Sequence, residues 1–180
     1  VDYIHKKSGD SLIWKGGSVF GDWLYYHPGE FDHTTSDGHT DRDLISTAFF
    51  AYSTQLLSDA ARILGKQDEY EKYSSLFARI RDVYQKEYTS ASGRVYTGSQ
   101  TAYVLSLMFD LLPEKLRANA AAYLVSDIRG RGNHLSTGFL GTPYLCHVLS
   151  RFGYDSVAYD LLLQETYPSW LYPVKMGATT

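Results

Sequence analysis

Hydrophobic side chains recur at helical spacing along most of the chain from Thr40 onward. Over residues 40–65 they return every three or four positions, and Thr40 or Asp41 can cap the start of this helix while Gly65 can end it. The same spacing predicts five further helices, at residues 68–88, 99–112, 113–130, 137–153 and 155–165. Residues 1–39 lack this periodicity, so we expect an irregular loop region there.

Charged residues are sparse in the first, third and fifth of these helices and more frequent in the second, fourth and sixth. The third and fifth each carry one charged residue, Asp110 and Arg151, whereas residues 66–87 carry ten. A helix with almost no charge is enclosed on most sides, and a helix with a charged face lies at the surface. The alternation predicts an all-α fold of three inner–outer hairpins over residues 40–165, about half of an (α/α)6 barrel. A helical-repeat scaffold is the alternative, although no fixed repeat period relates the pairs.

The amino-acid composition gives no support for nucleic acid or a membrane as a partner. The chain has 180 residues, of which 44% are hydrophobic and 21% charged, and a net charge of −3, which is typical of a globular domain. No basic field is present to attract nucleic acid, and no apolar run reaches the roughly 20 residues that span a bilayer. Cys146 is the only cysteine, so no disulfide forms within the chain, and its apolar neighbours predict a buried, unreactive thiol. The sequence leaves the localisation open.

A histidine-rich segment near the start of the first helix raises the possibility of a metal site. His27, His33 and His39 recur every six residues. Acidic residues stand among and after them, namely Glu30, Asp32, Asp37 and Asp41. A spacing of six fits no helical face and matches no zinc or calcium motif, so we interpret the segment as a polar surface loop and predict no metal or other cofactor. His147 lies on an apolar helix and is interpreted as a core histidine.

Two loops that lead into predicted inner helices carry candidate binding residues. Asp22 and Trp23 place a hydrogen-bond acceptor beside an aromatic ring, and Tyr and Trp rings suit stacking on sugars. In a helical toroid such loops line one mouth of the barrel. The alternative is that Asp22 caps a turn and Trp23 plugs the barrel. In the second loop His134 and Thr137 offer polar contacts, although Thr137 could equally cap the helix that follows.

Four stretches together resemble bacterial α-L-rhamnosidases. They are GDWL at 21–24, STAFFAYSTQLLSDAARILGK at 46–66, SQTAYVLSLMFDLLP at 99–113, and the block from 134 to 180 that begins HLSTGFLGTPY and ends YPSWLYPVKMGATT. The resemblance implies an (α/α)6 catalytic barrel and the hydrolysis of terminal α-L-rhamnosides with inversion, without a cofactor. In this family the loop that matches Asp22 and Trp23 contributes to the rhamnose site. The resemblance further implies substrate contacts from Trp170, which lies near the approach to the general base, and more weakly from His134 and Thr137 at the same mouth.

The resemblance also implies where the catalytic carboxyl groups lie. The general acid of the family precedes the matched segment, and the general base follows a Gly-Ala-Thr-Thr motif, which corresponds here to residues 177–180. We therefore expect no catalytic residue within the chain, a segment at 166–180 that leads toward the base, and no activity from these 180 residues alone. The alternatives are a non-catalytic helical scaffold that binds carbohydrate or protein, and another exo-glycosidase on the same barrel.

Half of a barrel has a further consequence for solution behaviour. The inner helices would expose apolar faces that neighbouring hairpins would otherwise cover. Exposed apolar patches drive association. We expect the isolated chain to self-associate, and we expect its ligand to be a rhamnose-containing glycoside or polysaccharide.

Overall fold

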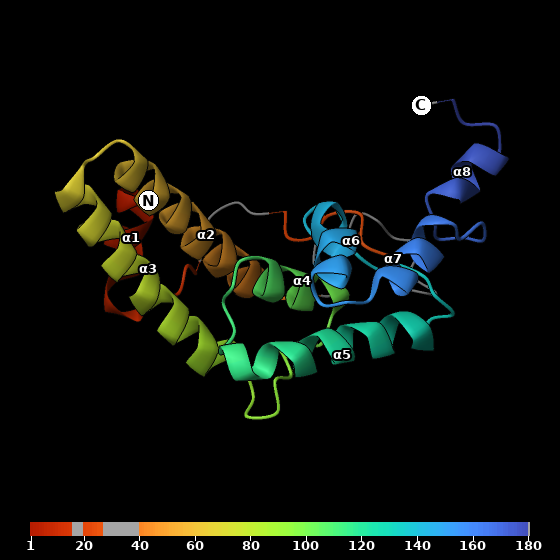
Figure 1. The fold of residues 1–180 in the computed structure, drawn as a ribbon, viewed down its shortest axis with the longest axis horizontal. Coiled ribbons are helices and arrows are strands. Elements are labelled where there is room, and N and C mark those ends of the chain that lie inside the picture. Colours follow the sequence, from red (N-terminus) through yellow and green to blue (C-terminus); the bar gives the residue numbers. More distant parts are fainter. Residues whose placement is uncertain (16–19, 27–39, 180) are drawn as a thin grey trace.

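The computed structural model describes residues 1–15, 20–26 and 40–179, and these residues form an all-helical fold (Figure 1). A 3₁₀ helix, Gly9–Ser11, follows the first α-helix. The α-helices are α1 (Asp2–Ser8), α2 (Arg42–Ile63), α3 (Gln67–Tyr88), α4 (Gln100–Met108), α5 (Glu114–Gly130), α6 (Thr142–Arg151), α7 (Asp155–Leu162) and α8 (Leu171–Lys175). The only β pairing among the described residues is an isolated bridge between Thr89 and Val95.

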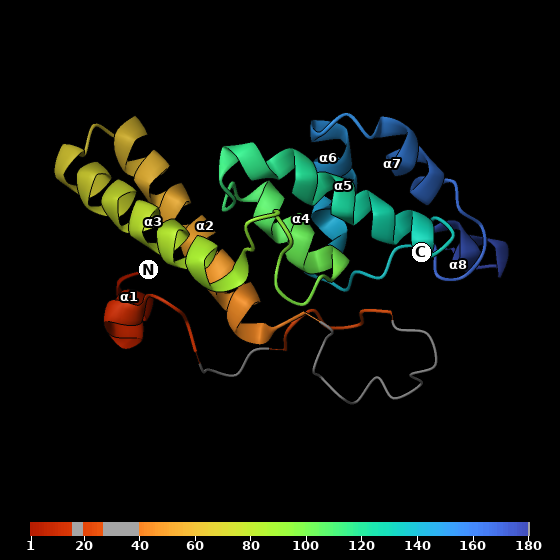
Figure 2. The ribbon, with the colours of Figure 1, turned by 90° about the horizontal axis from the view of Figure 1, so that it is seen from below.

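Three helical hairpins build the body of the fold. Helices α2 and α3, α4 and α5, and α6 and α7 pack as consecutive pairs, and α4 also packs between α2 and α6 (Figures 1 and 2). The inner helices are α2, α4 and α6, while α3, α5 and α7 lie outside them. The predicted inner–outer arrangement of an all-α barrel segment is thereby confirmed.

The burial of each helix explains its place. Helix α4 has no charged residue, and every residue from Gln100 to Leu107 is buried. Helix α3 buries a single stripe of five residues, Tyr73, Leu76, Ile80, Tyr84 and Tyr88. Because charge is costly to bury and apolar surface is favourable to bury, the charge alternation along the chain sorts the helices into inner and outer positions.

The helix ends show where the sequence was a good guide and where it was not. Asp41 caps α2, since its carboxylate accepts a hydrogen bond from the Leu44 N–H at 2.8 Å. The predicted helix 99–112 ends early, at Met108, because the backbone turns into the left-handed region at Asp110, where φ is 56°. The Asp110 carboxylate is held there by Arg117 at 2.6 Å and Arg151 at 2.7 Å. These ion pairs join the chain after α4 to α5 and α6.

The prediction of an irregular region over residues 1–39 was wrong at its start, where α1 forms. This helix has seven residues, too few to show a periodic apolar pattern. Asp2 lies in its first turn and Lys6 and Lys7 lie in its last, which complements the helix dipole. Asp2 also accepts hydrogen bonds from Lys72 at 3.1 Å and from the Tyr73 hydroxyl at 3.2 Å, so tertiary contacts with α3 hold the helix.

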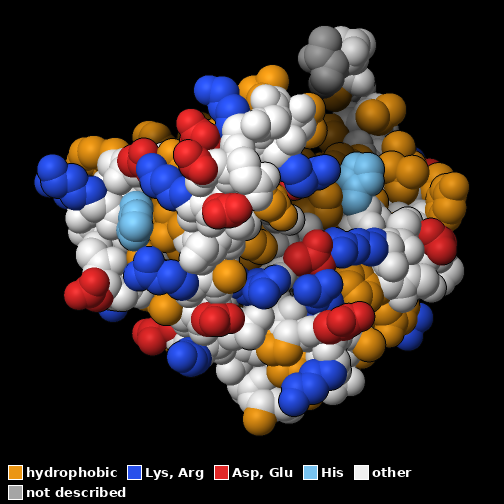
Figure 3. Space-filling view, turned by 60° about the vertical axis from the view of Figure 1, so that its left-hand side comes forward, with side chains coloured by type: hydrophobic (Ala, Val, Ile, Leu, Met, Phe, Trp, Pro, Cys, Tyr) orange, Lys and Arg blue, Asp and Glu red, His pale blue; other side chains and the backbone are white. Residues whose placement is uncertain are grey.

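Charges of both signs are interspersed over the face shown in Figure 3, with hydrophobic side chains between them. No single-sign field covers this face, in keeping with the small net charge of −3. Within the described ranges, no helix has both the length and the hydropathy needed to cross a bilayer.

Candidate functional site

The N-termini of the inner helices meet at one end of the hairpins. The Thr40 and Ser99 hydroxyls, which precede α2 and α4, are hydrogen bonded at 2.6 Å. At the start of α6, a Cβ on Gly141 would lie 2.3 Å from the Thr101 hydroxyl of α4. The described residues at the starts of α2, α4 and α6 therefore lie next to one another, and we call this end of the hairpins the mouth.

A groove of about 710 Å³ opens beside this mouth. Its walls come from three segments that are distant in the sequence, residues 24–26, 135–143 and 167–173. Its lining is mostly apolar and aromatic, and includes Tyr25, Tyr26, Phe139, Tyr167, Trp170 and Tyr172. Two threonines, Thr137 and Thr142, add hydroxyl groups. A concave surface with apolar walls and a few polar groups is the common form of a small-molecule site.

Asp22 joins the segment that forms the first wall of the groove, residues 24–26, to α4 and to the loop before α6. Its side chain is 1% exposed. One carboxylate oxygen, Oδ1, accepts hydrogen bonds from the backbone N–H groups of Leu140 at 2.9 Å and Gly141 at 3.3 Å. The other, Oδ2, accepts from the Gly138 N–H at 2.8 Å and from the Thr101 hydroxyl. The carboxylate thus caps the loop before α6 from a position more than a hundred residues earlier in the chain.

The two loops approach so closely that Gly138 has no room for a side chain. A Cβ at this position would lie 2.3 Å from the Trp23 carbonyl oxygen and 2.4 Å from that of Asp22. The Phe139 N–H donates to the same Trp23 carbonyl at 2.9 Å. The backbone of residues 22–23 therefore lies directly against residues 138–139, and the glycine permits the contact.

Trp23 lies at the rim of the groove and does not line it. Its ring stacks on Phe139, with 5.5 Å between the ring centroids and 20° between the planes. The side chain is 48% exposed, so part of the indole faces solvent. The sugar-stacking role of Trp23 stays a prediction, and the structure shows that Phe139 covers one side of the ring.

Of the other predicted residues, Thr137 and Trp170 line the groove and His134 does not. The Thr137 hydroxyl bonds the Thr142 hydroxyl at 2.7 Å. The N-cap residue of α6 is Gly141, so Thr137 is not the N-cap of this helix. The His134 ring bonds the Arg131 carbonyl at 2.7 Å and the Thr166 hydroxyl at 2.9 Å. His134 therefore joins the chain after α5 to the segment that carries Trp170, and its role toward a ligand remains a prediction.

Most of the aromatic lining was not among the predicted site residues. Tyr26 packs edge-on against Tyr167 with 5.1 Å between ring centroids, and Tyr167 packs against Tyr172 at 5.3 Å. The available signal was the high tyrosine count, 16 in 180 residues, together with the aromatic stretch after residue 165. Nothing in the local pattern pairs residue 26 with residue 167, because only the tertiary fold brings them together.

Like Asp22, Gln100 is a buried polar residue. Unlike Asp22, it was not among the predicted site residues. Its amide nitrogen donates to the Asp127 carboxylate at 2.9 Å and to the His134 carbonyl at 3.2 Å. Its amide oxygen accepts from the Ser136 N–H at 2.9 Å. The side chain thereby connects the start of α4 to α5 and to the second wall of the groove.

None of the described residues that line the groove is an aspartate or glutamate. A smaller acidic hollow of about 290 Å³ lies between the start of α2 and the end of α3, and its lining includes Asp41, Asp43 and Glu87. Burial raises the pKa of Asp43, and the neighbouring Asp41 raises it further while Lys15 lowers it. Within residues 1–15, 20–26 and 40–179, no group of three His, Cys, Asp or Glu side chains could hold a metal ion. The histidines at positions 27, 33 and 39 and the acids between them lie outside the described residues.

His147 and Cys146, for which the sequence predicted buried positions, both lie on α6. His147 is exposed, so its interpretation as a core histidine was wrong. Helix α6 buries Leu145, Val148 and Leu149, and its remaining positions are half-buried or exposed. Cys146 is only half-buried, and burial raises the pKa of its thiol, which favours the protonated form. The predicted lack of reactivity stays a prediction.

Comparison with known proteins gives a consistent family. All residues from 1 to 180 match the model of the bacterial alpha-L-rhamnosidase 6 hairpin glycosidase domain. An alpha-L-rhamnosidase of Streptomyces avermitilis is 44% identical over 178 residues, which is 99% of this chain. An alpha-L-rhamnosidase of Formosa agariphila is 42% identical over 163 residues, or 89% of this chain.

A solved structure agrees with the sequence matches. The crystal structure of Streptomyces avermitilis alpha-L-rhamnosidase complexed with L-rhamnose superposes with a TM-score of 0.88 at 43% identity, over 99% of this chain and 16% of that chain. The chain likewise spans only 16% and 17% of the lengths of the Streptomyces and Formosa relatives.

Proposed function

Since the chain belongs to the bacterial α-L-rhamnosidase six-hairpin glycosidase family, we propose that it forms part of the catalytic barrel of an enzyme that hydrolyses terminal α-L-rhamnosides. The aromatic groove beside the mouth is the observation that carries the proposal. It is assigned here as a binding surface for the rhamnoside, with Trp170 and Thr137 in its walls.

The chemistry of the groove suits this ligand. Rhamnose is a 6-deoxy sugar, so it has a methyl group and an apolar ring face beside its hydroxyls. Aromatic rings such as those of Tyr167 and Trp170 can pack against the apolar parts. The Thr142 hydroxyl, which donates to the Thr137 carbonyl at 3.3 Å, lies in the lining and can exchange this long bond for one to the sugar.

Hydrolysis with inversion requires two carboxyl groups about 6.5–9.5 Å apart, one to protonate the leaving oxygen and one to activate water. The groove lining contributes neither from the described residues. We assign the general acid and the general base to segments outside these 180 residues, in line with the small share of each relative that the chain spans. Asp22 is assigned to holding the first wall in place, because all of its contacts are internal.

An assay on an aryl α-L-rhamnoside tests the function. We expect no turnover by the 180-residue chain, and turnover with inverted rhamnose as the first product by the longest natural polypeptide that contains it. Aryl glycosides of other sugars, assayed in parallel, separate this function from that of another exo-glycosidase. Turnover by the 180-residue chain that is lost on replacing one of its own carboxylates would contradict the assignment of the acid and base.

We also propose that the isolated chain self-associates. Among the apolar side chains it exposes are two groups on neighbouring positions, Leu56, Ile63 and Leu64 toward the end of α2 and Tyr159, Leu162 and Leu163 on and after α7. Helix α4, expected to be one of the exposed inner helices, is fully covered instead.

Light scattering coupled to size-exclusion chromatography measures this association. The expected mass is a multiple of 20.3 kDa, and it should fall toward the monomer in a Leu64→Glu, Leu163→Glu double variant. Both positions are largely exposed, so the substitutions leave the core intact. A single species of monomer mass at high concentration in the unmodified chain would overturn this expectation.

A further inference from the structure

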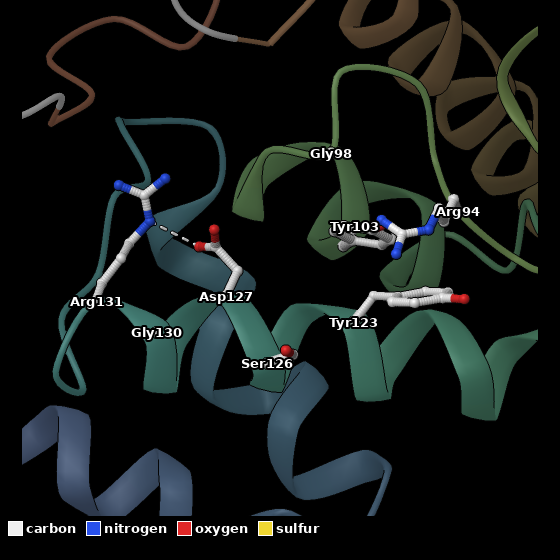
Figure 4. Close-up of a pocket in the computed structure, with 8 residues that line it drawn as sticks. All are labelled: Arg94, Gly98, Tyr103, Tyr123, Ser126, Asp127, Gly130 and Arg131. Atoms are coloured by element: carbon white, nitrogen blue, oxygen red, sulfur yellow. Dashed lines mark hydrogen bonds and ion pairs between the residues drawn. The ribbon is translucent and has the colours of Figure 1, made fainter.

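A second hollow, of about 450 Å³, lies apart from the aromatic groove, between the loop that precedes α4 and the outer helix α5 (Figure 4). The two hollows share no lining residue. The lining of the second one is polar, with Arg94, Arg131, Asp127 and Ser126 as its chemically distinctive members. Figure 4 shows the two arginines at opposite ends of the hollow, with Asp127 between them.

Arg94 is a cation without an acidic partner among the described residues. Its guanidinium lies over the Tyr123 ring, 4.4 Å from the ring centroid. The Tyr103 ring lies 6.2 Å from that of Tyr123 and helps to form the same wall. Stacking on tyrosine holds the plane of the guanidinium and leaves the N–H groups at its edge available as donors.

Arg131 is fixed from one side only. Its Nε donates to Asp127 Oδ2 at 2.8 Å, and the same oxygen accepts from Gln100 at 2.9 Å. Asp127 therefore holds Arg131 in place, while the two terminal nitrogens have no acceptor within the described part of the chain. Figure 4 shows these nitrogens on the far side of the guanidinium from Asp127.

The charge and the open space of this hollow favour the binding of an anion. Two guanidinium groups and one carboxylate leave the hollow with a net positive charge, although the chain as a whole carries −3. Gly98 and Gly130 line open space, since a Cβ at either would meet nothing within 4 Å. Guanidinium groups bind carboxylate, sulfate and phosphate oxygens through charge-assisted hydrogen bonds, and Ser126 can add a further donor.

We propose that this hollow is an oxyanion-binding site in which Arg131 holds a carboxylate, sulfate or phosphate group, while Arg94 adds positive charge from the other end of the hollow. The oxyanion can belong to an acidic sugar or can be a free inorganic ion. Asp127 and Ser126 are placed to contact hydroxyl groups beside it. The site is separate from the groove assigned to the rhamnoside, because the two share no lining residue.

Isothermal titration of the chain with D-glucuronate and with inorganic phosphate tests the proposal and distinguishes the two sources. D-glucose serves as the neutral match for glucuronate. We expect glucuronate or phosphate to bind in the millimolar range or tighter, glucose to bind at least tenfold more weakly, and binding to weaken as salt is raised. Tighter binding of glucuronate identifies an acidic sugar as the ligand class, and tighter binding of phosphate identifies a free ion.

Variants then locate the binding. Arg131→Gln should weaken it tenfold or more, and Arg131→Lys should lie between Arg131→Gln and the unmodified chain. Arg94→Gln should weaken it about threefold, because its charge acts from the other end of the hollow. Arg129→Gln makes the same change of charge on an exposed residue of α5 outside the hollow, and should change the affinity less than twofold. Arg94 is itself exposed, so circular dichroism and the melting temperature should confirm that its variant folds. The proposal is overturned if neither probe binds, or if Arg131→Gln binds as well as the unmodified chain.

Discussion

Replacing Gly138 with alanine is expected to destabilise the fold by about 3 kcal/mol or more. The added methyl group would lie 2.3 Å from the Trp23 carbonyl oxygen and 2.4 Å from that of Asp22. Both atoms belong to backbone, so no side chain can rotate away and one loop must move. That movement would also lengthen the hydrogen bonds that Gly138 and Phe139 make to residues 22 and 23.

Gly130→Ala is the matched control for this prediction. A Cβ at Gly130 meets nothing within 4 Å, and the residue ends α5, where alanine is the better helix former by up to about 1 kcal/mol. Urea unfolding followed by circular dichroism should show a large loss of stability for Gly138→Ala and none for Gly130→Ala. Equal midpoints for Gly138→Ala and the unmodified chain would show that the loops are not in the close contact described.

Removing the Asp22 carboxylate is expected to have an effect of similar size. Asp22→Ala leaves three backbone N–H groups and the Thr101 hydroxyl without their acceptor, and each unpaired buried donor costs about 1–3 kcal/mol. We expect a loss of about 4 kcal/mol in the free energy of unfolding, since some of these donors will reach water.

Asp22→Asn is the sharper variant because it preserves shape. Each carboxylate oxygen faces at least one backbone N–H, Oδ1 those of Leu140 and Gly141 and Oδ2 that of Gly138. Whichever way the amide is turned, its NH₂ group faces a donor. The expected loss is about 2–3 kcal/mol, measured by urea unfolding.

Asp160→Asn, on the exposed face of α7, makes the same chemical change and should leave the midpoint within about 0.5 kcal/mol of the unmodified chain. A stable Asp22→Asn variant would contradict the assignment of Asp22 as the residue that joins the loops.

The fold could be predicted from the sequence because its signal is spread over whole helices. A contrast such as ten charged residues in 66–87 against one in the third helix survives errors of several residues at each boundary. The predicted helix boundaries are wrong by several residues where a tertiary contact sets the end of a helix. The turn at Asp110 depends on arginines from α5 and α6, and α6 begins at Thr142 because the preceding loop bonds to Asp22.

The site could be predicted only in part, for a related reason. The sequence drew attention to Asp22, and it offered the capping of a turn as one of two roles. Which loop the carboxylate would cap could not be read locally, since its partners lie 116 to 119 residues later. The groove combines residues 24–26 with 135–143 and 167–173, and only the packing of the hairpins brings these segments together.

The proposed function depends on the binding of the rhamnoside in the aromatic groove beside the mouth. The most direct test is a crystal structure, with L-rhamnose bound, of the longest natural polypeptide that contains this chain. We expect the sugar in the groove, in van der Waals contact with Trp170 and within hydrogen-bonding distance of Thr137 or Thr142. Rhamnose bound elsewhere, with the groove empty or filled by another segment of the protein, would contradict it.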